Sequence, residues 1–115
     1  MKFFITVRWG NAESTDGPDS EDTHFLIRAH DFIEAATLTD QILLSMPTTS
    51  TKSKRPVQPF CHKIIEIGSD KSTINVPQVL MGPWIAYGYN VHNVHYRTWE
   101  RDGQNDKWQL GQNQA

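Results

Sequence analysis

The chain has 115 residues, the size of one ordinary domain, and its 11 basic against 13 acidic side chains give a net charge of −2. Hydrophobic residues make up 37% and charged residues 21%, which is typical of a globular protein and excludes an intrinsically disordered one. The small negative charge offers no general attraction to a polyphosphate backbone, so non-specific nucleic-acid binding is disfavoured. Its apolar runs are too short to span a bilayer.

The N-terminal part of the chain predicts two strands separated by an acidic loop. Apolar side chains alternate over residues 3–9 and again over residues 23–29, and we expect these strands to be antiparallel because no helix joins them. The spacing of acids in residues 10–22 does not match a calcium-binding loop, so we interpret this segment as a solvated loop that would steer a basic partner. Its five acids are Glu13, Asp16, Asp19, Glu21 and Asp22.

The clearest local signal is a helix start. Asp31 can cap the free amides of the first turn, and Glu34 follows at the spacing of a capping box. Apolar residues then recur every three or four positions, which predicts a helix over residues 32–45 that ends before Pro47. The stretch from Phe25 to Ala36 resembles the strand–helix junction of small bacterial α+β proteins, some of which are encoded beside toxins as immunity proteins.

The second half of the chain predicts further strands. A third strand is expected over residues 60–67, covered on both faces, and residues 74–83 are expected to be irregular because they contain two prolines and a glycine. Alternation predicts strands within residues 85–91 and 92–100, and the pair Asp102-Gly103 favours a hairpin turn with positive φ.

These elements predict a single α+β domain over residues 1–110, followed by a polar tail at residues 111–115. We expect two layers: a mainly antiparallel sheet of about five strands, with the one principal helix packed on it. If the chain crosses over the sheet through that helix, the second and third strands are parallel.

Enzymatic chemistry has only weak candidates. His92 and His95 would point to opposite faces of a strand, and the single Cys61 leaves no second thiol for a zinc site or a disulfide, which favours a reducing cytoplasm. No nucleophile elbow or glycine-rich phosphate loop is present. We therefore expect no metal and no cofactor, and we keep a small metal-dependent or cysteine hydrolase using these three residues as an alternative.

The main functional prediction comes from the aromatic residues. Six of the seven Trp and Tyr residues lie between positions 84 and 108, and Trp, Tyr and Arg are the residue types that dominate protein interfaces. We predict a non-enzymatic protein-binding module, an inhibitor or immunity-type protein that masks a partner surface, with a homodimer left open. The expected contact residues are Trp84, Tyr87, Tyr89, Tyr96, Arg97, Trp99, Arg101 and Trp108. The second alternative is a single-stranded nucleic-acid contact through Tyr96, Arg97, Trp99 and Arg101.

Overall fold

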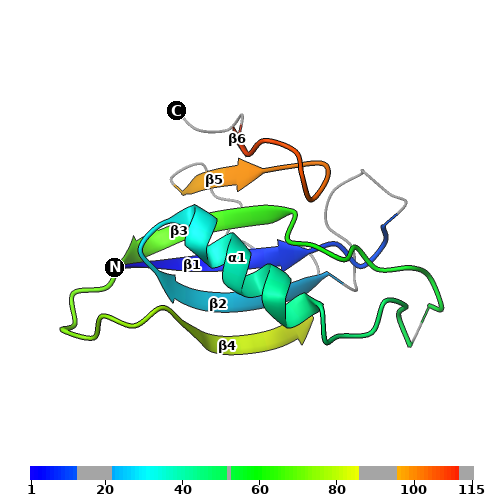
Figure 1. Cartoon of the computed structure of the whole chain (residues 1–115), viewed down its shortest axis with the longest axis horizontal. Coiled ribbons are helices and arrows are strands. Elements are labelled where there is room, and N and C mark those ends of the chain that lie inside the picture. The colour runs from blue at the N-terminus through cyan, green and yellow to red at the C-terminus, as the bar shows by residue number, and fades with distance from the viewer. Residues whose placement is uncertain (13–21, 52, 86–95, 112–115) are drawn as a thin grey trace.

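The computed structural model describes residues 1–12, 22–51, 53–85 and 96–111, and within them it contains one six-stranded antiparallel sheet with one α-helix lying across it (Figure 1). The strands lie in the order β4–β2–β1–β3–β5–β6. The predicted α+β class is therefore confirmed, with six strands in place of about five. The elements are β1 Lys2–Arg8, β2 Thr23–Ala29, α1 Phe32–Leu43, β3 Lys63–Ser69, β4 Gln78–Ile85, β5 Arg97–Glu100 and β6 Gln109–Leu110.

The central strand of the sheet is β1. It pairs antiparallel with β2 on one side, where Phe4 lies opposite Ile27, and antiparallel with β3 on the other, where Ile5 lies opposite Ile65. Since both neighbours run against β1, β2 and β3 are parallel to each other. The chain passes between them through α1, as the crossover required.

Alternation along the central strands gives the sheet two apolar faces. The face beneath α1 forms the larger cluster, and the opposite face forms a smaller one around Val7 and Ile65. The buried residues of the larger cluster are Phe4, Phe25, Ile27, Ala29, Ala35, Ala36, Leu43, Cys61 and Ile64.

The start of α1 follows the predicted capping pattern, with one difference. The Asp31 carboxylate accepts a hydrogen bond from the backbone N–H of Glu34 at 2.8 Å. The Glu34 carboxylate accepts from the backbone N–H of His30 at 2.7 Å, whereas a standard capping box would use that of Asp31. The helix ends at Leu43, two residues before the expected boundary. The chain then forms a tight turn through Met46.

Several boundaries in the second half of the sequence analysis were wrong. Residues 78–85 form the edge strand β4, although the prolines and glycine had predicted an irregular segment, and Ile85 ends this strand instead of starting the next. The third strand begins at Lys63, three residues late. The expected hairpin exists as the pairing of β5 with β6, but Gly82, not Gly103, is the described glycine with positive φ.

Some expectations lie outside the described residues. These are the strand that was predicted within residues 85–91, apart from Ile85, and the end of the polar tail. Among the residues that the structure does describe, no helix combines the length and the apolar character needed to cross a membrane.

Candidate functional site

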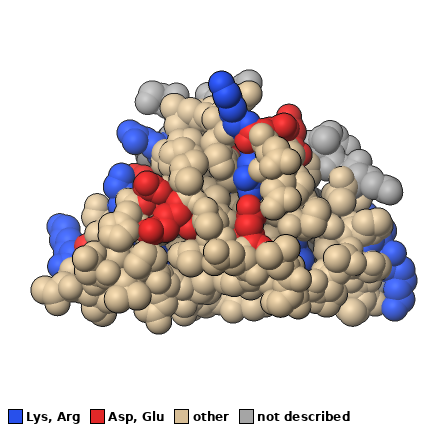
Figure 2. Space-filling view, in the orientation of Figure 1, with Lys and Arg blue, Asp and Glu red and all other residues tan. Residues whose placement is uncertain are grey.

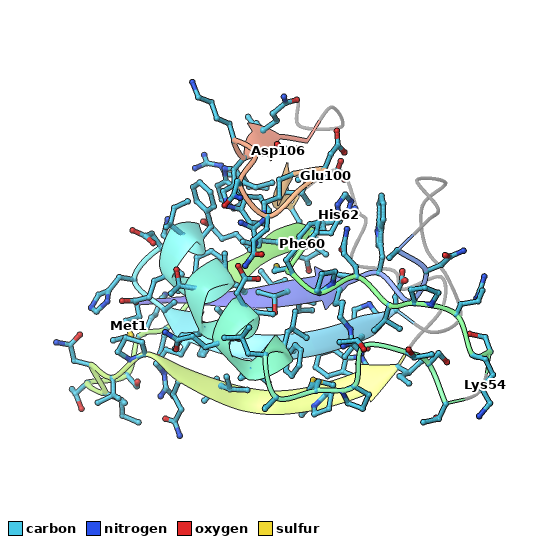
Figure 3. All side chains as sticks on the ribbon, turned by 45° about the vertical axis from the view of Figure 1, so that its right-hand side comes forward. Met1, Lys54, Phe60, His62, Glu100 and Asp106 are labelled. Atoms are coloured by element: carbon cyan, nitrogen blue, oxygen red, sulfur yellow. The ribbon has the colours of Figure 1, made fainter. Side chains whose placement is uncertain are left out.

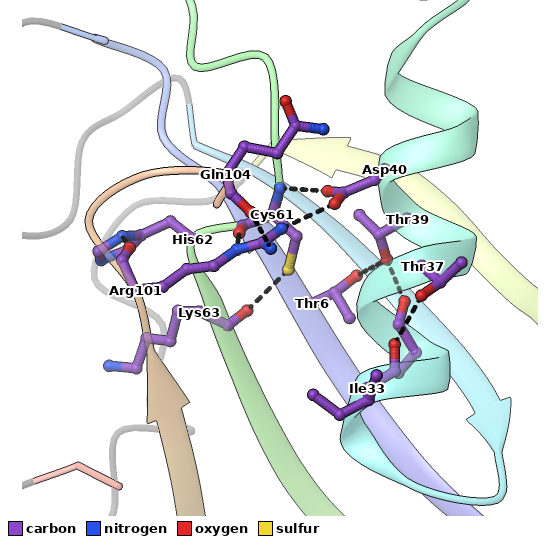
Figure 4. Close-up of polar contacts among 11 residues, drawn as sticks. Thr6, Ile33, Thr37, Thr39, Asp40, Cys61, His62, Lys63, Arg101 and Gln104 are labelled. Atoms are coloured by element: carbon purple, nitrogen blue, oxygen red, sulfur yellow. Dashed lines mark hydrogen bonds and ion pairs between the residues drawn. The ribbon is translucent and has the colours of Figure 1, made fainter. Parts of the chain in front are cut away.

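The predicted contact residue Arg101 is buried, because its guanidinium connects three parts of the fold (Figure 4). Its Nη2 donates to the Asp40 carboxylate at 2.7 Å, its Nε to the Cys61 carbonyl at 2.8 Å and its Nη1 to the Gln104 carbonyl at 2.8 Å. Asp40 in turn accepts the backbone N–H of Cys61 at 2.7 Å. Arg101 therefore connects α1 with the segment that precedes β3, and its guanidinium is occupied by contacts within the fold.

The aromatic rings near Arg101 also pack inward. Trp99 stacks on Phe32 of α1 with ring centroids 4.2 Å apart, and Trp108 meets the same ring edge-on at 6.2 Å. The Arg101 guanidinium lies 4.4 Å from the Trp108 ring centroid, which is a cation–π distance. Phe32, Trp99 and Trp108 are partly buried and pack against the larger apolar cluster.

The remaining predicted contact residues do not gather on one surface within the described chain. Tyr96 is half-buried against the smaller apolar cluster, Arg97 is exposed, and the half-buried Trp84 stacks on His24 with centroids 5.5 Å apart. Tyr87 and Tyr89 lie outside the described residues. The expected single surface around residues 96–101 is not formed, because Trp99 and Arg101 contact α1 while Tyr96 packs on the opposite face of the sheet.

The acidic loop needs one correction. Asp22 is fully buried, not solvated as expected, and its carboxylate accepts the backbone N–H of Gly10 at 2.8 Å, which connects the end of the loop to the end of β1. The other four acids, Glu13, Asp16, Asp19 and Glu21, lie outside the described residues.

The geometry gives no support to the hydrolase alternative. Cys61 is fully buried, and burial, followed by the charge of Asp40, raises the pKa of its thiol to about 12, so the nucleophilic thiolate is disfavoured. His92 and His95 lie outside the described residues. In the part of the chain that the structure describes, no group of three or more His, Cys, Asp or Glu side chains could hold a metal ion.

A cavity of about 610 Å³ lies at the end of the sheet where β1 and β4 finish and β2 begins. The chain that follows α1 forms its other wall, and the same loop carries Lys54, which is labelled at the right-hand end of the view in Figure 3. Among the described residues, the lining is mostly apolar or hydroxyl-bearing and contains one charged side chain: Arg8, Thr23, Met46, Pro47, Thr49, Ser50, Thr51, Val57, Pro83, Trp84 and Ile85.

The charged residue in this cavity is Arg8, which is 7% exposed. Its Nη2 donates to the Thr23 hydroxyl at 3.0 Å, and its Nη1 reaches the Pro47 carbonyl only at 3.5 Å. Its Nε is buried without a hydrogen-bond partner, and burial lowers the pKa of the guanidinium. Arg8 is a cation at a site that supplies it with few acceptors.

The second candidate feature is the apolar surface along residues 74–85, which we call the β4 edge. Five of the eight large hydrophobic side chains that are exposed in the described chain belong to it: Ile74, Val76, Leu80, Met81 and Ile85. β4 pairs with β2 on one side, and no described strand pairs with its other side. In Figure 2, the lower rim, where Figure 1 places β4, is free of charged side chains over most of its length.

A sequence signal for the β4 edge exists and was missed. The chain from Ser72 to Tyr96 contains no Asp, Glu, Lys or Arg, in a protein in which charged residues make up 21%. The Arg8 cavity has no such signal, because its walls come from four separate segments.

We compared the chain with protein families, curated proteins and solved structures. The sequence matches no protein-family model, and no curated protein or solved structure matches it.

Proposed function

We propose that this chain is a non-enzymatic protein-binding module that binds an uncharged, apolar segment of another protein on the β4 edge. The proposal is carried by the concentration of exposed large hydrophobic side chains within residues 74–85. Contiguous apolar surface is uncommon on proteins that work alone, and it marks interaction sites. A partner segment covered in this way is withheld from other contacts, which is how a masking protein acts.

The chemistry of the β4 edge indicates the kind of segment that fits. β4 carries no charged side chain, so a charged partner segment would lose hydration without gaining an ion pair. Register shifts against β2 and the missing N–H of Pro83 interrupt the regular pairing of this strand. Side-chain packing on residues such as Met81, which is 59% exposed, therefore contributes more than continuous backbone pairing.

The test compares Met81→Lys on the β4 edge with Leu44→Lys beyond the end of α1, where the side chain is 82% exposed. Random peptides displayed on phage are selected on the wild-type protein, and the affinities of the enriched peptides are measured by fluorescence anisotropy. We expect apolar peptides, at least about tenfold weaker binding to Met81→Lys, and unchanged binding to Leu44→Lys. Equal binding to both variants, or no enriched peptide, would overturn the proposal.

A second copy of the chain is the competing occupant. Sedimentation equilibrium of the wild type and of Met81→Lys distinguishes it from a foreign segment. A dimer that is lost in Met81→Lys would show that the β4 edge binds its own copy, and it would overturn the proposal of a separate partner. A monomer in both proteins, together with peptide binding, supports the proposal.

A further inference from the structure

Three arginines are buried in the described chain, and they differ in their partners. Arg28 is 9% exposed and pairs with Asp70 at 2.6 Å, while Arg101 is 8% exposed and pairs with Asp40 at 2.7 Å. Arg8 is 7% exposed, and no described carboxylate pairs with it. Burying a cation without a counter-charge costs free energy of folding, so the buried position of Arg8 needs an explanation.

The position of Arg8 provides that explanation. It lines the cavity of about 610 Å³, which is within the usual size of small-ligand sites, and none of the described residues that line the cavity is acidic. The Nε–H is buried without an acceptor, and Nη1 reaches the Pro47 carbonyl only at 3.5 Å, so the guanidinium keeps unused donor capacity at Nη1 for a ligand oxygen. A guanidinium matches the two oxygens of a carboxylate better than any other protein cation does.

The other residues that line the cavity indicate the chemistry of the rest of the ligand. Met46, Val57 and Ile85 are apolar, and the hydroxyl groups of Thr49 and Thr51 add donors that carry no charge. Such walls suit a hydrocarbon or aromatic body, whereas a strongly hydrated inorganic anion would lose its water shell without compensation.

We propose that this cavity binds the carboxylate group of an otherwise apolar organic molecule, with Arg8 as the counter-charge. Such a carboxylate belongs either to a free small acid or to the C-terminus of a polypeptide, and both offer the same two oxygens to the guanidinium. The proposal is independent of the β4 edge as a protein-binding surface, although Ile85 belongs to both features.

The test uses matched pairs of probes that differ only in charge. The first pair is 3-phenylpropanoate and 3-phenylpropanamide, and the second is an acetylated Ala-Ala-Phe peptide with a free or an amidated C-terminus. Binding is measured by isothermal titration calorimetry, with inorganic phosphate as competitor. We expect at least one carboxylate to bind about 30-fold or more tightly than its amide, because removing one partner of a buried charge pair has an effect of that size.

Two variants connect that binding to the cavity. Arg8→Met removes the cation, and Thr51→Trp fills the exposed mouth while Arg8 stays in place, so a failure of the first variant to fold leaves the second as a test. Arg97→Met, at an exposed arginine on β5, is the matched control. We expect both cavity variants to lose carboxylate binding and the control to keep it.

The possible outcomes distinguish the two sources of the carboxylate and identify the results that contradict the proposal. Binding of the small acid alone identifies a free ligand, and binding of the peptide alone identifies a polypeptide C-terminus. Equal affinity for acid and amide, displacement by phosphate at equal concentration, unaffected binding in Thr51→Trp, or no binding of either acid would overturn the proposal. Met81→Lys tests the protein-binding function separately, since Met81 does not line the cavity.

Discussion

At the scale of single residues, the buried arginines show how one side-chain type takes different roles. Arg101 completes its hydrogen bonds with Asp40 and with two backbone carbonyls, and so joins a helix to the sheet. Arg8 occupies an equally buried position, but its acceptors are the Thr23 hydroxyl and a long contact to the Pro47 carbonyl, and neither is a carboxylate. The difference arises from which chain segments lie opposite each guanidinium, because the two side chains have the same chemistry.

The contact between Arg101 and Asp40 gives a prediction for stability. Asp40→Ala leaves the buried guanidinium without its carboxylate, and we expect the free energy of unfolding to fall by about 3 kcal/mol. Urea denaturation followed by circular dichroism measures the change. Asp106→Ala, at an exposed carboxylate, is the control and should change stability by less than about 0.5 kcal/mol. Equal effects of the two substitutions would contradict the role assigned to Asp40.

Buried histidines give a second prediction. Burial is the main cause that lowers the pKa of His24 and of His62 below the usual 6.5. Below pH 6.5 the unfolded chain therefore binds more protons than the folded one. Their contribution to stability is complete above pH 6.5, and it is lost as the pH falls from 6.5 toward the depressed folded values.

The substitution His62→Asn checks this dependence. The asparagine amide can replace the ring Nδ1 that contacts the Arg101 carbonyl at 2.6 Å, but it does not titrate. We expect the variant to lose less stability than the wild type between pH 7.5 and pH 5, as measured by urea denaturation at each pH. Stability curves that stay parallel over this range would show that His62 does not contribute to acid sensitivity.

At the scale of elements, β4 depends on one glycine for its close approach to β2. Gly82 has a φ of 119°, in a region that favours glycine. A Cβ atom placed there would lie 2.7 Å from the His24 carbonyl oxygen and 2.9 Å from the Phe25 ring. The strand can therefore cross this point only without a side chain.

Replacing this glycine tests the importance of that approach. We expect Gly82→Ala to lower the free energy of unfolding by about 2 kcal/mol or more, through backbone strain and the clash with β2. Gly68→Ala is the matched control, because nothing lies within 4 Å of the added Cβ and its φ is not positive; we expect it to be neutral or to stabilise by up to about 1 kcal/mol. Thermal and urea denaturation measure both. A tolerated alanine at position 82 would mean that β4 adapts to the side chain.

Elements with strong local signals were predictable, and those without them were not. β1 and β2 show strict alternation, and α1 begins at a capping aspartate, so each is determined by residues near one another in the chain. β4 contains a glycine and a proline within its span, and Pro77 directly precedes it. Its strand conformation comes from pairing with β2, a contact that no local pattern reports.

At the scale of the whole molecule, the described elements form one connected unit. Every strand hydrogen-bonds to at least one neighbour, and α1 packs on the central strands of the same sheet. We expect a single cooperative unfolding transition, with coincident urea curves from far-ultraviolet circular dichroism and from tryptophan fluorescence. Curves with separate midpoints would show that part of the described chain unfolds independently of the rest.

The sequence by itself determined the α+β class, the helix start and the antiparallel pairing of the first two strands, because alternation and capping act between near neighbours. Only the tertiary structure decided which charged side chains are paired. Arg101 meets Asp40 across 61 positions of the chain, and Arg28 meets Asp70 across 42. Arg8 lines a cavity whose described walls come from four segments, and no carboxylate in the described chain pairs with it there. Pairing of buried charges depends on contacts between distant segments, and the local periodicity of a sequence does not encode those contacts.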